Sequence, residues 1–264
     1  MTLQMLAIDL GKQSFYLHGI DADGVIVSRK VSRAKLAEVV NSLGPATIAM
    51  EACASAHYWG RRWLAAGRAV RLINPRFVKP FVKGSKNDAV DAEAIFEAAM
   101  RPTMRFVPVK SVDQQDLQSL HRARERLICQ RTALINHTRG LLAEYGIVLP
   151  QGPWRFATQA PAAIADADLS DLARQIFCEL LDQLSDLNRR VEKLDAKVVA
   201  ICRTSDACRR LAKLPGVGPV IATAIVAAVD QRQPFSLPTR AREGRGGDDG
   251  AGRRSQVRGC ARRQ

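Results

Sequence analysis

The sequence predicts an α/β protein in which a mixed sheet is followed by long helices. Three features support this fold class. Short apolar segments separated by turn residues fill the first 75 positions, residues 111–145 are nearly free of Gly and Pro, and a second helical periodicity covers 172–201. A chain of 264 residues, 47% of them hydrophobic, is long enough for one large domain or two modest ones.

The segments of the first domain follow one another in a clear order. Three strands joined by short turns are expected to form a meander, and a helix, a strand, a helix, a strand and a further helix follow. The expected strands and helices cover 3–11, 14–21, 25–31, 32–44, 47–52, 56–67, 69–75 and 87–100. In such a sheet we expect the first and fourth strands to be neighbours.

The second half of the chain reads as helical. A long helix over 111–145 is followed by a loop over 150–167, which is rich in Pro, Gly and Ala. Ser170 or Asp171 can cap a second long helix. Its apolar residues recur every three or four positions, as in a coiled coil: Leu172, Ile176, Leu180, Leu184, Leu187, Val191, Leu194, Val198 and Ile201. The two helices pair either within one chain or between two, and a homo-oligomer (dimer or tetramer) is expected.

The overall charge indicates a polyanionic partner. Forty Lys and Arg residues against 26 Asp and Glu give a net charge of +14, which is typical of proteins that bind nucleic acid, although solubility or an anionic membrane would also explain it. The six cysteines include no Cys-x-x-Cys pair and no His at zinc-ligand spacing. The N-terminus lacks the basic region of a signal peptide, so we expect a cytoplasmic protein without a membrane segment.

Four carboxylates stand out as candidate metal ligands. Asp9 interrupts an apolar strand and Glu51 ends another, at positions where a core would favour Val or Ile. Asp88 and Asp91 lie three residues apart, so a helix there places both on one face. The alternative for this pair is an ordinary helix N-terminus stabilised by the helix dipole. If all four converge, they form the oxygen ligand set that Mg²⁺ prefers.

Basic and glycine-rich segments are candidate nucleic-acid contacts. Arg and Lys stand beside Trp63, Phe77 and Phe81, and the run over 121–139 carries charges of mostly one sign. A solvated helix face is the alternative. The segment "LPGVGPVIATAIV" has the pattern of a helix-hairpin-helix or of a plain αα turn. The candidate contacts are Lys79, Lys83, Lys86, Arg122, Arg124, Arg126, Arg131, Arg139, Gly216 and Gly218.

The motifs "AIDLGKQ", "AMEAC", "KNDAVDAEAI" and "RTALINHTRGLLAEYGIVLPQG" resemble the DEDD transposases of the insertion-sequence family numbered one hundred and ten. The resemblance covers about residues 4 to 235, with four separate motifs in the family's order. It implies a ribonuclease-H-like (resolvase-like) mixed sheet, followed by a long α-helical hairpin and a partial helical C-terminal domain. It also implies catalysis by Asp9, Glu51, Asp88 and Asp91 with Mg²⁺, and DNA and a structured guide RNA as partners.

The resemblance divides the chain into four regions. A catalytic domain over 1–110 is followed by a long helical, coiled-coil region over 111–205, the start of a C-terminal transposase domain over 206–235, and a disordered Arg/Gly-rich tail over 236–264. The family's serine segment is replaced there by a sequence that reads as a shifted frame. We therefore expect nucleic-acid binding without complete recombination. The alternatives are a non-catalytic nucleic-acid-binding remnant and a Holliday-junction resolvase.

Overall fold

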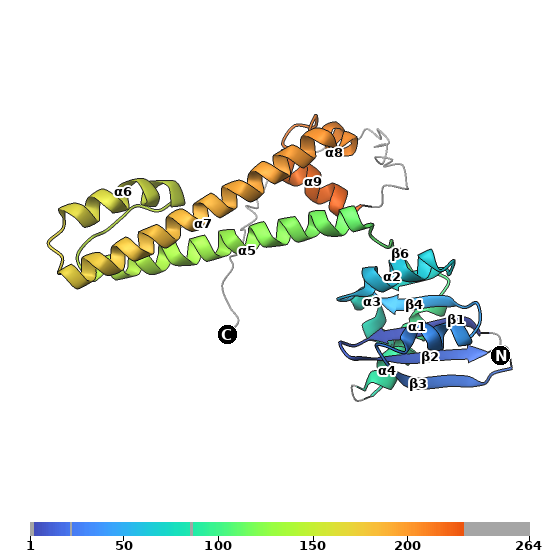
Figure 1. Cartoon of the computed structure of the whole chain (residues 1–264). Coiled ribbons are helices and arrows are strands. Elements are labelled where there is room, and N and C mark those ends of the chain that lie inside the picture. Colours follow the sequence, from blue (N-terminus) through green and yellow to red (C-terminus); the bar gives the residue numbers. More distant parts are fainter. Residues whose placement is uncertain (1–2, 22, 85–86, 230–264) are drawn as a thin grey trace, which may run out of the picture. The chain divides into compact units, whose positions relative to one another are not determined.

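A computed structural model describes residues 3–21, 23–84 and 87–229 of the chain (Figure 1). They fall into two compact units, which divide between Gln115 and Asp116. We refer to these as the sheet unit and the helical unit, and describe each by itself. The boundaries of the four predicted regions stay a prediction, and the tail over 236–264 lies outside the described residues.

The sheet unit is built on a six-stranded mixed sheet with the strand order β3-β2-β1-β4-β5-β6. The strands are β1 (Leu3–Leu10), β2 (Ser14–Asp21), β3 (Ile26–Ser32), β4 (Thr47–Glu51), β5 (Val70–Ile73) and β6 (Phe106–Val107). Strands β1, β2 and β3 form the expected antiparallel meander, while β4 runs parallel to β1 and β5. The predicted ribonuclease-H-like class is confirmed, including the neighbouring first and fourth strands. The two-residue β6 is an addition that the sequence did not predict.

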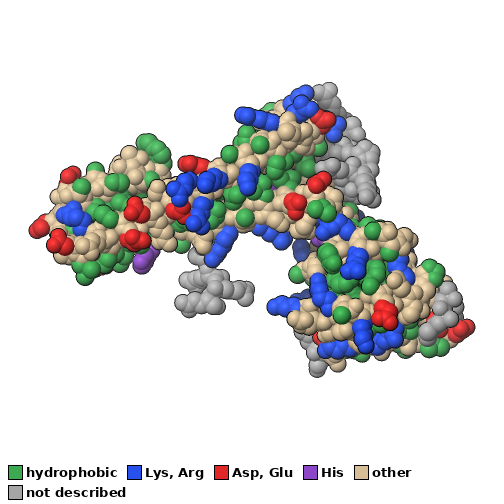
Figure 2. Space-filling model, in the orientation of Figure 1, with side chains coloured by type: hydrophobic (Ala, Val, Ile, Leu, Met, Phe, Trp, Pro, Cys, Tyr) green, Lys and Arg blue, Asp and Glu red, His purple; other side chains and the backbone are tan. Residues whose placement is uncertain are grey.

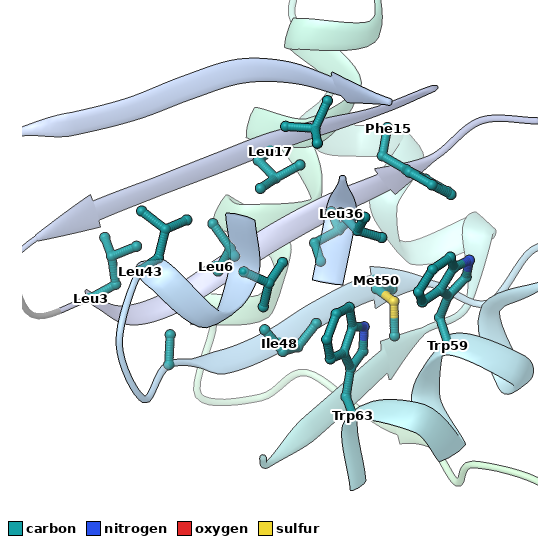
Figure 3. Packing of buried hydrophobic residues seen from close by; sticks show 14 of the residues in the cluster. Leu3, Leu6, Phe15, Leu17, Leu36, Leu43, Ile48, Met50, Trp59 and Trp63 are labelled. Carbon is teal, nitrogen blue, oxygen red and sulfur yellow. The ribbon is translucent and has the colours of Figure 1, made fainter. Parts of the chain in front are cut away.

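Helices cover both faces of this sheet. They are α1 (Leu36–Ser42), α2 (Ala56–Ala65), α3 (Pro75–Val78), the short 3₁₀ helix η1 (Lys79–Phe81) and α4 (Asp88–Met100). Alternate strand residues face opposite sides. Leu6 and Ile8 pack with α1 and α2, where Trp59 and Trp63 stack (Figure 3). Met5 and Ala7 instead join the apolar cluster that includes the buried face of α4.

The segment after β6 is fastened to α2. The backbone N–H of Lys110 donates to Nδ1 of His57 (3.2 Å), and the carbonyl of Lys110 accepts from Arg61 (2.9 Å). One helical turn away, a Cβ added to Gly60 would come within 2.9 Å of Val109. Burial, followed by the positive charges of Lys110 and Arg61, lowers the pKa of His57 to about 4, which keeps its ring neutral and able to accept.

The helical unit contains two long helices that lie side by side (Figure 1). Its helices are α5 (Val112–Ala143, which begins in the last residues of the sheet unit), α6 (Pro153–Asp166), α7 (Asp171–Thr204), α8 (Asp206–Leu211) and α9 (Pro219–Ala228). Contacts join Arg124 to Asp195 and Arg131 to Asn188. From Arg124 to Arg131 the chain advances seven residues along α5, while the partners run back seven residues along α7, from Asp195 to Asn188. This antiparallel register confirms the predicted hairpin within one chain.

The prediction of a loop over 150–167 is wrong, because most of this segment forms α6. Phe156, Ala160 and Ile164 recur every fourth residue and are buried in the same cluster as parts of α5 and α7. Pro161 lies inside the helix, at a cost of about 3 kcal/mol relative to Ala. Burial of this apolar face outweighs the helix-breaking composition that suggested a loop.

The seam of α7 also differs from the expected one at its start. Leu172 and Ile176 are 68% and 46% exposed, whereas Ala173 and Phe177 are buried. From Leu184 onward the buried residues Leu184, Val191 and Val198 are expected seam positions, whereas the expected Leu187, Leu194 and Ile201 are half-buried. Cys202 is buried as well, although the seam did not predict it. Ser170 caps the helix as expected, because its side chain accepts from the N–H of Ala173 (3.2 Å).

Two short helices, α8 and α9, flank the glycine turn as predicted. Gly216 has a φ of +81°, and Gly218 caps α9 with a φ of −83°. Cys208 and Ala222 pack with Leu117 of α5 in a small apolar cluster. Within the described part of the chain, no helix combines the length and the apolar character needed to span a bilayer.

Candidate active site

Asp9 and Glu51 lie side by side at the ends of two parallel strands. Strand β1 pairs with β4 so that Ile8 stands opposite Met50. Asp9 and Glu51 each follow one position later. Residues in register on neighbouring strands lie about 5 Å apart and point to the same face, so these two carboxylates share one edge of the sheet.

That face is the one covered by α4. The alternation that sends Met5 and Ala7 toward α4 sends Asp9 the same way. Asp88 and Asp91 occupy the first turn of α4, which begins after Asn87, whose side chain accepts from the N–H of Ala89 (3.1 Å). The N-terminus of a helix favours acidic residues. One cap therefore fixes the start of the helix that carries half of the acidic set.

The charges of the other three carboxylates act on Asp9. The pKa of Asp9 rises from 3.8 to about 6, first because of burial and then because of the charges on Asp91, Asp88 and Glu51. Burial, Glu51 and Asp9 likewise raise the pKa of the Cys53 thiol to about 11. Negative charge is therefore concentrated around Asp9, and a cation there would relieve the repulsion.

The acidic set is open rather than a closed coordination shell. No group of three or more His, Cys, Asp or Glu side chains within 3–21, 23–84 and 87–229 is arranged to hold a metal ion. The chemistry of the set still fits a hard divalent cation, since all four donors are carboxylate oxygens. Asp9, Glu51 and Asp91 are partly buried and Asp88 is exposed, so the set faces solvent on one side.

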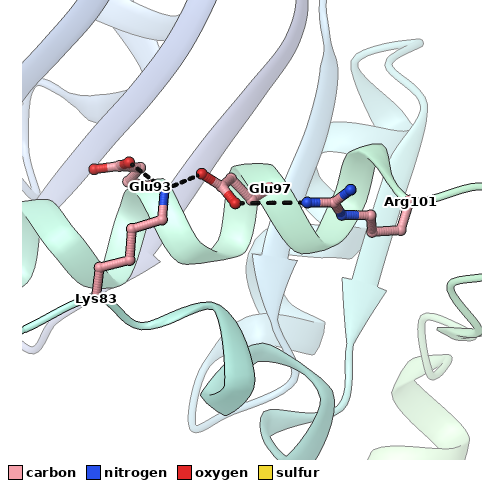
Figure 4. A network of polar contacts seen from close by, with 4 residues as sticks. All are labelled: Lys83, Glu93, Glu97 and Arg101. Carbon is pink, nitrogen blue, oxygen red and sulfur yellow. Dashed lines mark hydrogen bonds and ion pairs between the residues drawn. The ribbon is translucent and has the colours of Figure 1, made fainter.

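Two lysines near α4 have carboxylate partners. Lys30 Nζ lies 3.4 Å from Oδ2 of Asp88, and both side chains are 60% exposed. Lys83 Nζ lies 2.5 Å from Oε1 of Glu97 and 3.4 Å from Oε1 of Glu93 (Figure 4). The hydrogen bond to Lys83 lowers the pKa of Glu97. Lys83, predicted to contact nucleic acid, is thus bound to α4 in this structure.

The other two predicted lysines differ from Lys83. Lys79 lies in η1 and is exposed. Lys86 lies outside the described residues. Exposed lysines are suited to phosphate contacts, because their charge remains hydrated and mobile until an anion binds.

The arginines predicted to contact nucleic acid divide into two groups. Arg124 pairs with Asp195, Arg131 reaches Asn188 at 3.5 Å, and Arg139 donates to the carbonyl of Pro150 (3.2 Å). These three hold parts of the helical unit together.

Arg122 and Arg126, by contrast, are exposed on α5. Lys and Arg side chains gather along the middle of the α5–α7 hairpin in Figure 2. The two predicted glycines both precede α9, and Gly218 is its N-cap. The first helical residues after Pro219 carry the N–H groups that have no partner within a helix.

The sequence profile of the IS110 DEDD transposases, described as "Transposase", matches residues 6–147. This span is more than half of the chain and contains Asp9, Glu51, Asp88 and Asp91. The chain belongs to the IS110 family of transposases.

Curated relatives agree with the family. A "Probable family 20 transposase" of Pseudomonas aeruginosa is 44% identical over 240 residues, which are 89% of this chain and 71% of the relative. The "Transposase for insertion sequence element IS1111A" of Coxiella burnetii is 39% identical over 236 residues, 88% of this chain and 65% of the relative. The "Transposase for insertion sequence element IS1328" of Yersinia enterocolitica is 34% identical over 220 residues, 83% and 66% of the two chains.

Two side chains of this IS110-family site were missed from the sequence. Cys53 lies in the motif "AMEAC" but was not predicted as a site residue, and the charges of Glu51 and Asp9 help to raise the pKa of its thiol. Lys30 reaches Asp88 across 58 residues of chain. The signal for Lys30 was present, because Val27 and Val31 alternate with it and are buried on the opposite face.

Proposed function

We propose that the sheet unit acts on DNA phosphodiester bonds, with Asp9, Glu51, Asp88 and Asp91 as ligands of a divalent cation. The main support is their placement: Asp9 and Glu51 end neighbouring parallel strands on the face that α4 covers, and the first turn of α4 carries Asp88 and Asp91. The raised pKa of Asp9, due first to burial and then to the other three charges, agrees with this placement. A protein that needs only stability has no reason to gather like charges at a sheet edge. Membership of a transposase family gives this arrangement a substrate class, namely DNA.

The four residues have different supports. Strand pairing fixes the main chain at Asp9, which stands opposite Tyr16 of β2, and at Glu51, which stands opposite Ile73 of β5. Asp88 and Asp91 are positioned by the start of α4 and can adjust by side-chain rotation. Mg²⁺, when bound, would neutralise charge on the scissile phosphate and lower the pKa of an attacking hydroxyl. The protein's own task is to hold oxygens at fixed spacing and to leave one side open for the DNA.

The proposed DNA contacts are exposed basic residues. Lys79 is exposed in η1 of the sheet unit, and Arg122 and Arg126 are exposed on α5. Arg and Lys on a surface bind phosphates of either DNA or RNA, so a structured guide RNA is proposed as a second partner of the same surfaces. A homo-oligomer is proposed as well. Since much of the α5–α7 seam is buried within one chain, an oligomer would use other surfaces.

The direct test is metal-dependent cleavage by the purified chain. Labelled duplexes carrying an element end, and four-way junctions, are incubated with Mg²⁺, Mn²⁺ or EDTA. Asp9→Asn and Asp91→Asn should lower cleavage by about 100-fold or more, and should also weaken Mn²⁺ binding measured by calorimetry. Glu38→Gln is the matched control, because Glu38 is exposed on α1, which packs on the opposite face of the sheet. Cleavage by Asp9→Asn at the unmodified rate would reject the proposal.

A second function is favoured by one observation. Arg122 and Arg126 are exposed on α5, in the helical unit, which carries none of the four carboxylates, as suits a chain that binds nucleic acid without cutting it. This alternative predicts DNA binding that weakens steeply with salt, unchanged by Asp9→Asn, and no cleaved product with any cation.

A further inference from the structure

The sheet carries a polar row that runs from the acidic set to β3. Lys30 stands opposite Tyr16, and Tyr16 stands opposite Asp9. The row continues to Glu51 at the end of β4, next to Asp9 on β1. Neighbouring strands lie about 4.8 Å apart, so the row spans about 14 Å from the ammonium-bearing strand to the last carboxylate.

All members of the row point to the α4 face. Phe15, Leu17 and Val31 are buried in the core beneath α1 and α2, so Tyr16 and Lys30 take the other side. His18 confirms this direction, because its ring lies 5.4 Å from that of Phe96 on α4. A cation therefore stands at one end of a row whose other end is acidic.

Lys30 reaches from this row to the start of α4. Its Nζ lies 3.4 Å from Oδ2 of Asp88, with both side chains 60% exposed. Exposed ion pairs contribute little to stability, typically about 0–1 kcal/mol. The ammonium is therefore held loosely enough to exchange this carboxylate for another anion.

We propose that Lys30 is a positioning residue for the DNA phosphate next to the bond on which the acidic set acts. Without cation and DNA, it neutralises Asp88. When a divalent cation binds the carboxylates, Asp88 turns to the cation and Lys30 binds the backbone phosphate. This inference rests on the proposed function, since it assigns a further residue to the same site.

The exchange predicts two effects of opposite sign. Removing the ammonium of Lys30 removes the competitor of the cation for Asp88, so the cation binds more tightly. The same change removes one phosphate contact, so DNA binds more weakly and with a smaller salt dependence. A side chain that only supports the fold would weaken both interactions or neither.

The experiment uses the whole chain with Lys30→Gln. Mn²⁺ affinity is measured by calorimetry without DNA, and binding of a labelled duplex is measured by fluorescence anisotropy at several KCl concentrations. We expect Mn²⁺ affinity to rise about twofold to fivefold, DNA affinity to fall by a similar factor, and the salt slope to fall by about 1. Lys30→Arg should retain the DNA contact.

Lys35→Gln is the matched control. Lys35 is an exposed lysine at the start of α1, which packs on the opposite face of the sheet, and its loss should move neither affinity by more than a screened surface charge does. Lys30→Gln with both affinities unchanged, or with both shifted in the same direction, overturns the inference.

Asp9→Asn separates this failure from failure of the proposed function. If Asp9→Asn abolishes Mn²⁺ binding while Lys30→Gln changes nothing, only the role of Lys30 is wrong. If Asp9→Asn leaves Mn²⁺ binding intact, or if the unmodified chain does not bind DNA, the proposed function is itself wrong.

Discussion

In the sheet unit Asp9 lies among three other carboxylates, whereas in the helical unit Arg124 is paired with Asp195. The first arrangement gathers like charge and raises a pKa. The second neutralises charge between two helices. The role of a charged residue therefore depends on its neighbours. Carboxylates that lie close to one another indicate a binding site, whereas an arginine that is paired with a carboxylate indicates a contact that stabilises the fold.

The largest expected effect on stability concerns the buried apolar seam between the helices of the helical unit. Leu184→Ala should lower the stability of the helical unit by about 2–5 kcal/mol, because Leu184 is buried and its loss leaves a cavity. Leu172→Ala, on the same helix but 68% exposed, should change it by less than about 0.5 kcal/mol. Hydrogen exchange of the α7 amides measures this unit separately. Equal effects of the two substitutions would contradict the buried seam.

The second test concerns the repelled carboxylates. The native pKa of Asp9 is raised, so between about pH 4 and 6 the native state binds more protons than the unfolded state. This part of the stability therefore falls as pH rises through that window. Asp9→Asn removes the penalty and should be more stable than the unmodified chain by about 1–2 kcal/mol at pH 8, with little advantage at pH 4. That figure is below the full shift, because the carboxyl is partly solvated.

The measurement is urea unfolding in EDTA, followed by Trp59 and Trp63 fluorescence in a Trp154→Phe background. Trp154 is 76% exposed in the other unit, so its replacement leaves a signal from the sheet unit alone. His57 shifts stability in the opposite direction, because its lowered pKa favours the native state as pH rises from about 4 to 6.5. Only the difference between variant and parent therefore isolates Asp9. A difference that does not depend on pH would remove the electrostatic basis of the candidate site.

The third test separates backbone geometry from phosphate binding at the α8–α9 turn. Gly216→Ala should destabilise the turn by about 1 kcal/mol, because a φ of +81° is unfavourable for a residue with a Cβ. Gly218→Ala should cost less, about 0.5 kcal/mol, because its φ is −83° and no atom lies within 4 Å of the added Cβ, although Ala is a poorer N-cap than Gly. Hydrogen exchange of the α9 amides gives the comparison. If Gly218→Ala instead weakens DNA binding without changing exchange, the helix start itself contacts DNA.

The smallest expected effects distinguish exposed from paired arginines. Arg122→Gln and Arg126→Gln should each weaken DNA binding about twofold to fourfold and lower the salt slope by about 1, with stability unchanged. Arg124→Gln should mainly lower the stability of the helical unit, because it leaves Asp195 without its partner. Anisotropy titrations and thermal unfolding of the three variants check this. The reverse pattern would mean that the ion pair with Asp195 opens to bind DNA.

Much of the sheet unit could be predicted because its signals are local. Strand alternation places Asp9 and Glu51 on one face, and the crossover order makes their strands neighbours. The Asn87 cap and the three-residue spacing of Asp88 and Asp91 locate the other carboxylates. Strand β6 was missed because two residues carry no periodicity.

The helical unit was harder to predict, because its deciding contacts are distant in sequence. Arg124 and Asp195 are separated by 71 residues, so no local pattern distinguishes a paired arginine from a free one. Helix α6 contains Pro161 and is helical only because Phe156 and its neighbours pack on α7. In the sheet unit, local alternation with Val27 and Val31 gives the face on which Lys30 lies, but its contact with Asp88 depends on strand register and on the position of α4.

The hydrogen bonds between Lys110 and α2 determine which fragments of the chain can be expected to fold. Backbone bonds from Lys110 to His57 and Arg61, and the contact of Val109 with Gly60, hold the segment after β6 to α2. A fragment cut just after α4, at about residue 104, would lose these contacts and leave the edge of β5 unpaired. A fragment ending at Gln115 keeps them. The shortest fragment that folds by itself and carries all four carboxylates is therefore expected to extend past α4 to the first turn of α5. In limited proteolysis, cleavage on the C-terminal side of Lys110 should precede cleavage between α4 and Lys110.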